Sequence, residues 1–490
     1  MRKSGILMPV FSLPSNQCCG TFGRGAYDFV RFLSKSGQKV WQILPLCPID
    51  YTFSPYQSSS AFAGNPLFID FELLAEMGLV SKSDFESFDK SPDKCDYKKA
   101  FNYTDIILKK AFSNFNIENF KAEYENFLEE NKYWLLDFAL YSVIKEENGG
   151  VAWIEFPTEL KKRNETALKE YQNTHKTEIE FVFFTQFMFF KQLNNLKTFA
   201  HSLSVSLFGD MPIYVAFDSA DCWAHKEAFM LNSDYTPSFV AGTPPDAFSE
   251  EGQVWGSPLY DFKAQSEEEI PYRFWKERIK SALKIYDIVR IDHFRAFEAF
   301  FAIPSKTMRA SDGKWIKGPG IAFFNEIKRA VGNNLPIVAE DLGVITDGVK
   351  QLLKRTMFPG MKVLQFGFDG NLQNPYLPYN FTENSVGYIG THDNETLVEF
   401  EKKHKLEATR LMNYIGRSSE SFNWAVIRLL MSSVANTVIF TMQDIAMQDE
   451  SYRFNTPGTV ENNWVYRIDP AITNDWLAGI LKELTEQYGR

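Results

Sequence analysis

The chain has 490 residues, a formal net charge of −10 at pH 7 and a hydrophobic content of 44%. This length exceeds that of a bare (β/α)8 barrel, about 250 residues, and requires two domains or one barrel with large insertions. The acidic balance argues against a nucleic-acid partner, because binding a polyanion needs a basic surface.

The cysteines and the apolar segments indicate the compartment. The five cysteines are odd in number and lack C-x-x-C spacing, which favours a reducing environment over a zinc site or a disulfide framework. The apolar run near the N-terminus is short and contains Pro9, and the Phe-rich segment 181–190 is half the length of a membrane span. We therefore expect a soluble, cytoplasmic protein without a membrane partner.

Eight strand-like apolar runs recur along the chain, bounded by Gly, Pro or Asp. They cover residues 5–11, 40–46, 205–215, 285–293, 335–343, 361–370, 384–393 and 436–445. Most are continuously hydrophobic, as strands buried on both faces are, and helix-forming stretches separate most of them. This alternation predicts an α/β fold with a parallel sheet, and eight repeats favour a closed (β/α)8 (TIM) barrel.

Two intervals are too long for simple crossovers. Residues 51–200 begin with a Ser/Gly/Pro-rich loop and continue as Lys/Glu-rich helical sequence. Residues 216–275 are rich in Pro, Gly, Asp and Trp and have a loop-like composition. Both intervals leave the C-terminus of a strand. We therefore expect one catalytic barrel over residues 1–490, with a helical insertion (51–200) and a loop-rich insertion (216–275) over its C-terminal face.

Three acidic residues each close one of the apolar runs. They are Asp292 in IVRIDH, Glu340 in PIVAEDLG and Asp393 in GYIGTHDN. The C-terminal strand ends of a (β/α)8 barrel share one face, and active sites lie there. Cleaving a glycosidic bond with retention needs an ionised nucleophile and a proton donor about 5 to 5.5 Å apart. The sequence therefore predicts glycosidic-bond chemistry at this mouth.

The neighbours of these acids suggest separate roles. Arg290 lies two residues before Asp292, so both side chains point to one face of the strand, and the guanidinium favours an ionised nucleophile. The apolar lead-in to Glu340 favours the neutral form of an acid/base, and Asp393 is suited to binding ring hydroxyls. An acid at a strand end is also often a helix cap, and local sequence does not decide between Glu340 and Asp341.

The chain resembles 4-alpha-glucanotransferases of the amylomaltase (disproportionating enzyme) family in three catalytic segments, RIDHFR (290–295), AEDLG (339–343) and GTHDNET (390–396). Further family segments match at 54–70, 242–262, 359–370 and 455–464, in consistent order from residue 5 to about 467. The combination of RIDHFR with the Pro- and Trp-containing segment 242–262 distinguishes this family from ordinary alpha-amylases.

The resemblance implies roles for individual residues. Asp292 becomes the nucleophile, Glu340 the acid/base and Asp393 the transition-state stabiliser. The implied substrate-binding residues are Tyr56, Asp210, Asp246, Gln253, Trp255, Arg290, His392, Asn463 and Trp464. The implied substrates are α-1,4-glucans and maltooligosaccharides.

We expect a retaining double displacement that transfers a glucan segment to the 4-hydroxyl of another glucan or of glucose. Transfer requires a bound acceptor to be better oriented than water, and the two insertions offer a cover for it. Two alternatives remain, a hydrolytic alpha-amylase-type glycosidase and a catalytically inactive glucan-binding protein. Because the sequence has no phosphate-binding Gly loop, Cys/His cluster or calcium-loop motif, we expect no metal or other cofactor.

Overall fold

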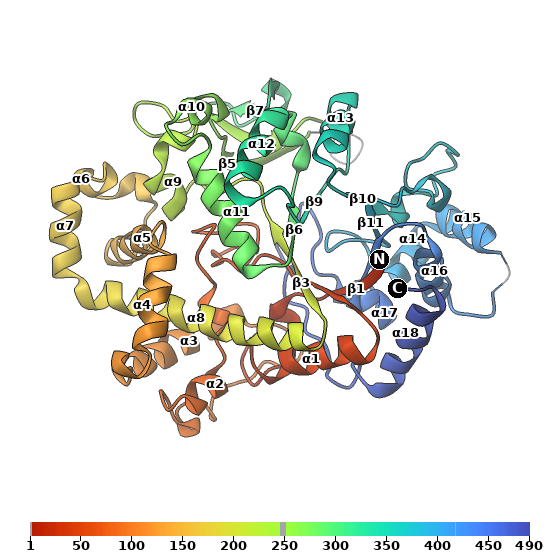
Figure 1. Ribbon diagram of the computed structural model, residues 1–490, viewed down its shortest axis with the longest axis horizontal. Helices are drawn as coiled ribbons and strands as arrows, with labels where there is room; N and C mark the ends of the chain where they lie inside the picture. Colours follow the sequence, from red (N-terminus) through yellow and green to blue (C-terminus); the bar gives the residue numbers. More distant parts are fainter. Residues whose placement is uncertain (1, 246–250, 417) are drawn as a thin grey trace.

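The centre of the molecule is a closed barrel of eight parallel strands (Figure 1). The structure is a computed structural model and describes residues 2–245, 251–416 and 418–490. The barrel strands are β1 (Lys3–Leu7), β2 (Val40–Gln42), β3 (Ser206–Met211), β6 (Ile288–Ile291), β9 (Ile337–Ala339), β10 (Gly360–Val363), β11 (Ser385–Tyr388) and β12 (Thr437–Thr441). Each overlaps one of the predicted apolar runs, so the predicted (β/α)8 barrel is confirmed.

The register between β3 and β6 positions the residues of the mouth. Around the barrel the strands follow the order β1-β12-β11-β10-β9-β6-β3-β2, and Asp210 on β3 pairs with Arg290 on β6. Gly209 faces the opposite side, because a Cβ there would come within 2.2 Å of the Tyr286 ring. Since successive strand residues alternate in direction, Asp210 points into the barrel and lies beside Arg290.

Amphipathic helices surround the barrel. In the first of them the buried positions Ala26, Phe29, Val30 and Leu33 follow the spacing of one helix face. The main helices of this outer layer are α1 (Arg24–Lys35), α8 (Lys176–Ser202), α11 (Arg273–Ile285), α12 (Gly320–Val331), α13 (Asp347–Thr356), α16 (Phe422–Ser432) and α18 (Asp475–Gln487).

The long interval between β2 and β3 is mostly helical. It contains α2 (Phe71–Glu76), α3 (Tyr97–Ser113), α4 (Lys121–Glu130), α5 (Leu135–Glu147), α6 (Thr158–Lys161) and α7 (Glu165–Thr174), and it ends with α8. Helices α4 to α7 form the left side of the molecule in Figure 1. The Phe-rich segment lies in α8 and is largely buried; a Cβ on Gly64 would come within 2.1 Å of the Phe189 ring. The loop after β2 therefore lies directly on α8.

A second, antiparallel sheet stands beside the barrel and is not predicted by the sequence pattern. Its strand order is β5 (Gln253–Pro258), β4 (Phe239–Thr243), β7 (Ala299–Pro304) and β8 (Lys314–Lys317). The segment after β3 supplies β4 and β5, and the segment after β6 supplies β7 and β8. Strands β4 (FVAGT), β5 (QVWGSP) and β8 (KWIK) have a mixed composition without an apolar run, whereas β7 (AFFAIP) is apolar and was not among the eight predicted runs.

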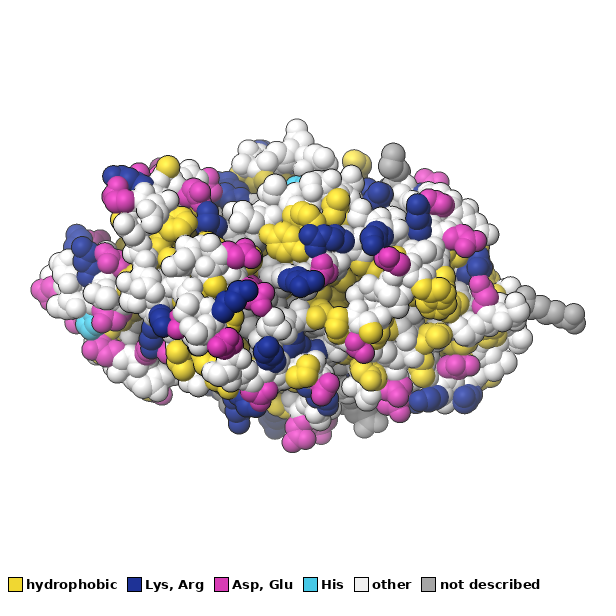
Figure 2. All heavy atoms as spheres, turned by 90° about the horizontal axis from the view of Figure 1, so that it is seen from below, with side chains coloured by type: hydrophobic (Ala, Val, Ile, Leu, Met, Phe, Trp, Pro, Cys, Tyr) yellow, Lys and Arg dark blue, Asp and Glu magenta, His cyan; other side chains and the backbone are white. Residues whose placement is uncertain are grey.

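Short helices complete the loops at the strand ends. They are α9 (Ala220–Ala224) and α10 (Phe262–Glu267) after β3, α14 (Leu397–Lys403) and α15 (Lys405–Ile415) after β11, and α17 (Met442–Ile445) after β12. On the face in Figure 2, acidic and basic side chains are interspersed rather than grouped by sign. Among the helices of the described ranges, none combines the length and apolar character needed to cross a bilayer.

Candidate active site

Arg290 is the centre of a buried ion network at the mouth of the barrel. Its Nη1 donates to both carboxylate oxygens of Asp210, each at 2.7 Å, and its Nη2 donates to Oδ1 of Asp292 at 2.7 Å. The side chain of Asp210 is fully buried, whereas that of Asp292 is 31% exposed. Arg290 therefore fixes the orientation of Asp292 and leaves this carboxylate accessible to a ligand.

Glu340 directly follows β9 and faces the turn after β6. Its Oε2 accepts a hydrogen bond from the backbone N–H of His293 and its Oε1 accepts one from Leu342, each at 2.7 Å. Burial raises the pKa of Glu340, and the charge of Asp292 raises it further. Together they outweigh Arg290 and the two N–H donors and bring the pKa to about 7. This carboxyl group can therefore both give and take a proton near neutral pH.

The adjacent Asp341 points in another direction. Its Oδ1 accepts a hydrogen bond from the backbone N–H of Met361 on β10 at 2.6 Å, and the residue is buried. Burial raises its pKa to about 6, although Lys362 and the hydrogen bond from Met361 oppose the shift. Of the two neighbouring acids, Glu340 is thus the one that interacts with Asp292, a choice that local sequence left open.

Asp393 follows β11 in a polar environment. Its Oδ1 accepts a 2.7 Å hydrogen bond from Asn455 Nδ2, and its Oδ2 lies 3.3 Å from Nε2 of His392. Desolvation raises the pKa of Asp393, but the charge of His392 and the hydrogen bonds outweigh this and lower it to about 2. Desolvation lowers the pKa of His392, but Asp393 reverses the shift and raises it. The carboxylate, 47% exposed, is therefore ionised and accessible.

Two residues beyond β12 hold Asp393, and neither was singled out from the sequence. Asn455 binds the carboxylate, and Nη2 of Arg453 donates to the backbone carbonyl of Asp393 at 3.0 Å. Arg453 also reaches the buried Glu399 on α14, at 3.4 Å. They lie about 60 residues from Asp393 in the chain, and the only sequence signal is that Asn455 begins the family segment 455–464.

An aromatic cluster stands next to this acid. The hydroxyl of Tyr56 donates to Oδ2 of Asp210 at 2.7 Å, and its ring stacks on His392 with centroids 5.1 Å apart. Trp464 packs against both rings, at 5.8 Å from Tyr56 and 6.0 Å from His392. Four of the predicted binding residues, from distant parts of the chain, therefore meet in one place.

Asn463 is engaged within its own loop. Its Oδ1 accepts from the backbone N–H of Thr456 at 2.9 Å, and its Nδ2 donates to the carbonyl of Thr459 at 2.8 Å. These bonds shape the loop that carries Asn455 and Trp464. A direct contact between Asn463 and substrate stays a prediction.

The predicted residues of the segment 242–262 reach the mouth from β5. Trp255 Nε1 donates to Oε1 of Gln253 at 3.0 Å, and the Trp255 ring meets the imidazole of His293 edge-to-face at 5.0 Å. This strand therefore contacts the residue that follows Asp292. Asp246, the remaining predicted residue of the segment, lies outside the described residues.

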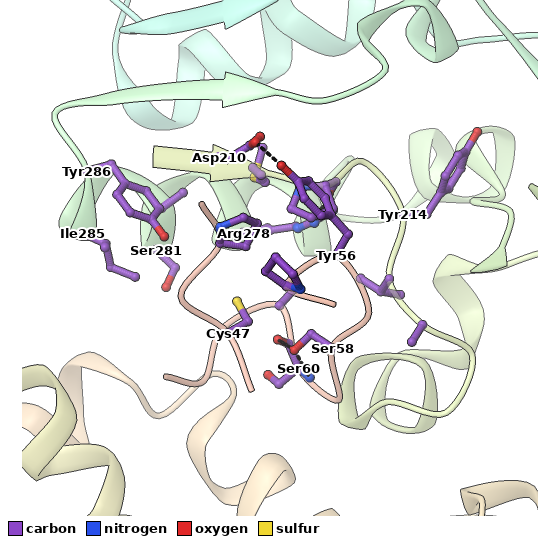
Figure 3. Close-up of a pocket in the computed structure, with 18 residues that line it drawn as sticks. Cys47, Tyr56, Ser58, Ser60, Asp210, Tyr214, Arg278, Ser281, Ile285 and Tyr286 are labelled. Atoms are coloured by element: carbon purple, nitrogen blue, oxygen red, sulfur yellow. Dashed lines mark hydrogen bonds between the residues drawn. The ribbon is translucent and has the colours of Figure 1, made fainter. Parts of the chain in front are cut away.

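A small cavity of about 50 Å³ adjoins the hydrogen bond between Tyr56 and Asp210 (Figure 3). Its walls come from the loop after β2, the end of β3 and α11, and include Cys47, Tyr214 and Arg278. This volume accommodates a few water molecules, far less than a sugar ring. The accessible carboxylates Asp292 and Asp393 do not line it, so this cavity is separate from the space in front of these two acids.

The comparison with known protein sequences identifies the family of this chain. The family model described as 4-alpha-glucanotransferase matches residues 8–473. A 4-alpha-glucanotransferase of Clostridium butyricum is 43% identical over 99% of this chain and 100% of its own length, and one of Thermus thermophilus is 42% identical over 96% and 95%.

Among solved structures, amylomaltases are similar to this chain. Amylomaltase from Streptococcus agalactiae in complex with acarbose is 39% identical and superposes with a TM-score of 0.96 over 100% of both chains. Amylomaltase from Corynebacterium glutamicum is only 17% identical and shares the fold, with a TM-score of 0.79 over 99% of this chain and 74% of its own. The chain belongs to the 4-alpha-glucanotransferase family.

Proposed function

We propose that the enzyme transfers α-1,4-glucan segments between maltooligosaccharides by a retaining double displacement, with Asp292 as nucleophile, Glu340 as acid/base and Asp393 as transition-state stabiliser. The observation that carries this proposal is the raised pKa of Glu340 beside an Asp292 held by Arg290. One carboxyl group retains its proton near neutral pH while its neighbour is paired with a guanidinium, as glycosyl transfer with retention requires.

In the first step, the Glu340 carboxyl donates its proton to the glycosidic oxygen while Asp292 attacks the anomeric carbon. Oδ1 of Asp292 is bound by Arg290, so we assign the attack to Oδ2. The C1–O4 bond breaks, the leaving glucan departs with a new 4-hydroxyl group, and the donor segment remains as an ester of Asp292 with inverted configuration.

In the second step, the Glu340 carboxylate takes the proton from the 4-hydroxyl of an acceptor glucan. The resulting oxygen nucleophile attacks the anomeric carbon, and the ester bond to Asp292 breaks. A second inversion restores the α-linkage, and both carboxyl groups return to their starting protonation states. The ionised Asp393 accepts hydrogen bonds from ring hydroxyls as positive charge develops on the sugar.

The other residues of the mouth bind the glucan. Tyr56 offers an aromatic ring to the donor sugar, with His392 and Trp464 supporting it and Asp210 fixing its hydroxyl. Gln253 and Trp255 lie on β5 on the side of the mouth next to His293, where they can position an acceptor. Acarbose in the Streptococcus agalactiae amylomaltase supports an oligosaccharide ligand for this site.

The compartment is part of the proposal. All five cysteines are free, and four of them are buried. Free thiols are typical of proteins in reducing compartments, so we place the enzyme in the cytoplasm.

Incubation with maltotriose separates transfer from hydrolysis. A transferase converts it into glucose and a series of longer maltooligosaccharides while the total number of reducing ends stays constant. A hydrolase would instead raise the reducing ends in step with substrate loss.

We expect D292N to remove turnover and to retain maltotriose binding in calorimetry, while D28N, an exposed position on α1, behaves as wild type. A wild-type protein that binds maltotriose without any turnover would favour an inactive glucan-binding protein.

A further inference from the structure

We propose that His293 is a positioning residue for Glu340, because its left-handed backbone conformation directs an N–H group to the Glu340 carboxylate. The proposal rests on the acid/base role proposed for Glu340. It adds a residue that acts on the substrate through Glu340 and not by its own contact with the sugar.

The backbone geometry at this turn is unusual. His293 has φ 48° and ψ 48°, in the left-handed region that non-glycine residues rarely adopt. The N–H of Asp292 still continues the strand pattern and donates to the carbonyl of Met211 at 3.1 Å. The next two N–H groups both turn to Glu340: that of His293 donates to Oε2 at 2.7 Å, and that of Phe294 donates to the carbonyl at 3.1 Å. The turn therefore binds both the side chain and the backbone carbonyl of Glu340.

The imidazole packs within the same turn. It meets Trp255 edge-to-face, with ring centroids 5.0 Å apart and an interplanar angle of 89°. Burial lowers the pKa of His293 to about 4, although the charge of Asp292 opposes the shift. The ring is therefore neutral at neutral pH and adds no positive charge beside the nucleophile. Histidine is also among the non-glycine residues that tolerate the left-handed region best.

The pKa of Glu340 depends on its charged and polar neighbours, so it reports whether the N–H group of His293 is in place. Arg290 faces Glu340 from β6, and Asp292 faces it from the residue after this strand. Tyr376 faces Glu340 from the loop after β10. Of these, Asp292 raises the pKa of Glu340, while Arg290 and the two backbone N–H groups lower it. Losing the N–H of His293 removes stabilisation of the ionised form only, so the pKa of Glu340 must rise.

The test replaces residue 293 by residues that differ in their tolerance of the left-handed region. Glycine adopts it readily, alanine less so, and valine least, because its β-branch crowds the backbone. For H293V we expect the alkaline limb of kcat/KM for maltotriose to move up by about half to one pH unit, and kcat to fall about 10- to 100-fold. For H293G we expect the limb to stay at the wild-type pH, and for H293A an intermediate shift.

A matched control comes from Met357, which has φ 62° at the C-terminus of α13 and is exposed. The variant M357V introduces the same backbone conflict at the end of a helix that precedes β10, and its pH profile should equal that of wild type. If H293V does not fold, the comparison of H293A with H293G carries the test.

Two results would overturn the proposal. One is an unchanged alkaline limb in a folded H293V or H293A variant. The other is an equal shift in H293G and H293A, which would assign the effect to the imidazole rather than to the backbone. Failure of the proposed function is distinguishable, because it would appear as full turnover of maltotriose by E340Q in the wild-type background.

Discussion

Glu340 and Asp393 are carboxyl groups of one barrel mouth, yet their pKa values are about 7 and about 2. The difference follows from their neighbours. Glu340 is desolvated next to the charge of Asp292, whereas Asp393 lies beside His392 and accepts a hydrogen bond from Asn455. One environment therefore preserves a proton and the other preserves a negative charge, which are the two properties that the proposed mechanism needs.

The pKa of Glu340 predicts the alkaline side of the pH profile. The first step needs the protonated carboxyl group, so kcat/KM should be half-maximal near pH 7 and fall about tenfold per pH unit above it. Initial rates of maltotriose disproportionation between pH 5 and 9 measure this limb. A rate that stays constant up to pH 9 would contradict the assigned role.

The raised pKa of Glu340 also predicts that the folded protein loses stability as the pH rises. The pKa of Glu340 rises from 4.5 to about 7 on folding, so the folded state binds a proton that the unfolded state has released between these values. Its contribution to stability is therefore complete below pH 4.5 and is lost as pH rises through 7, by up to about 3 kcal/mol.

The variant E340Q removes this titration. We expect it to be more stable than wild type at pH 8 and to differ little at pH 4.5, in urea unfolding monitored by circular dichroism. E129Q, which changes an exposed side chain on α4, should show no such pH-dependent difference. An equal effect of E340Q at both pH values would show that the carboxyl group does not titrate between them.

The sequence predicts the acids and Arg290 of the site, but not the backbone groups and the distant side chain that bind these acids. The strand period places Arg290 beside Asp292, and the apolar lead-in to Glu340 anticipates its retained proton. The N–H groups of His293 and Leu342 that bind Glu340 depend on the path of two turns, which the pattern of apolar and charged residues does not specify. Asn455 depends on the path of a loop from the far end of the chain.

At the scale of elements, α8 holds the loop that carries Tyr56. Gln186 accepts from the N–H of Gly64 at 2.7 Å and donates to its carbonyl at 3.0 Å. Gln192 makes the same pair of bonds to Asp70, at 2.7 and 3.1 Å. Two buried amides thus satisfy both backbone groups of two loop residues and fasten the loop after β2 to the helix.

The variant Q186M tests this attachment. Methionine preserves the volume but leaves the N–H and carbonyl of Gly64 without partners in a buried place, so we expect a loss of about 2 to 4 kcal/mol in the free energy of unfolding. KM for maltotriose should rise because the loop carries Tyr56. N194M, at an exposed position of the same helix, should change stability by less than about 0.5 kcal/mol. Equal losses in the two variants would contradict this account.

The barrel strands were predictable because both of their faces are buried, which makes most of their residues apolar. Strands β4, β5 and β8 of the second sheet have a mixed composition and show no such run, and β7 (AFFAIP), although apolar, carries no signal that it belongs to a separate sheet. Pairing of β4 with β7 joins two segments that follow different barrel strands, and no local pattern specifies such a partner.

At the scale of the whole molecule, the site is assembled from almost the full length of the chain. Tyr56 comes from the loop after β2, Trp255 from the second sheet, and Asn455 and Trp464 from the segment beyond β12. These parts surround the strand ends that carry Asp292, Glu340 and Asp393. We propose that these parts orient a bound acceptor better than bulk water is oriented, which is the condition for transfer.

The covalent intermediate on Asp292 is the central claim, and its capture is the most direct test. E340Q incubated with α-maltosyl fluoride can form the ester, because fluoride leaves without a proton, but it lacks the base for the second step. Mass spectrometry of the digested protein should then show a maltosyl group on the peptide that contains Asp292. A maltosyl group on another carboxylate, or release of β-maltose without any adduct, would contradict the account.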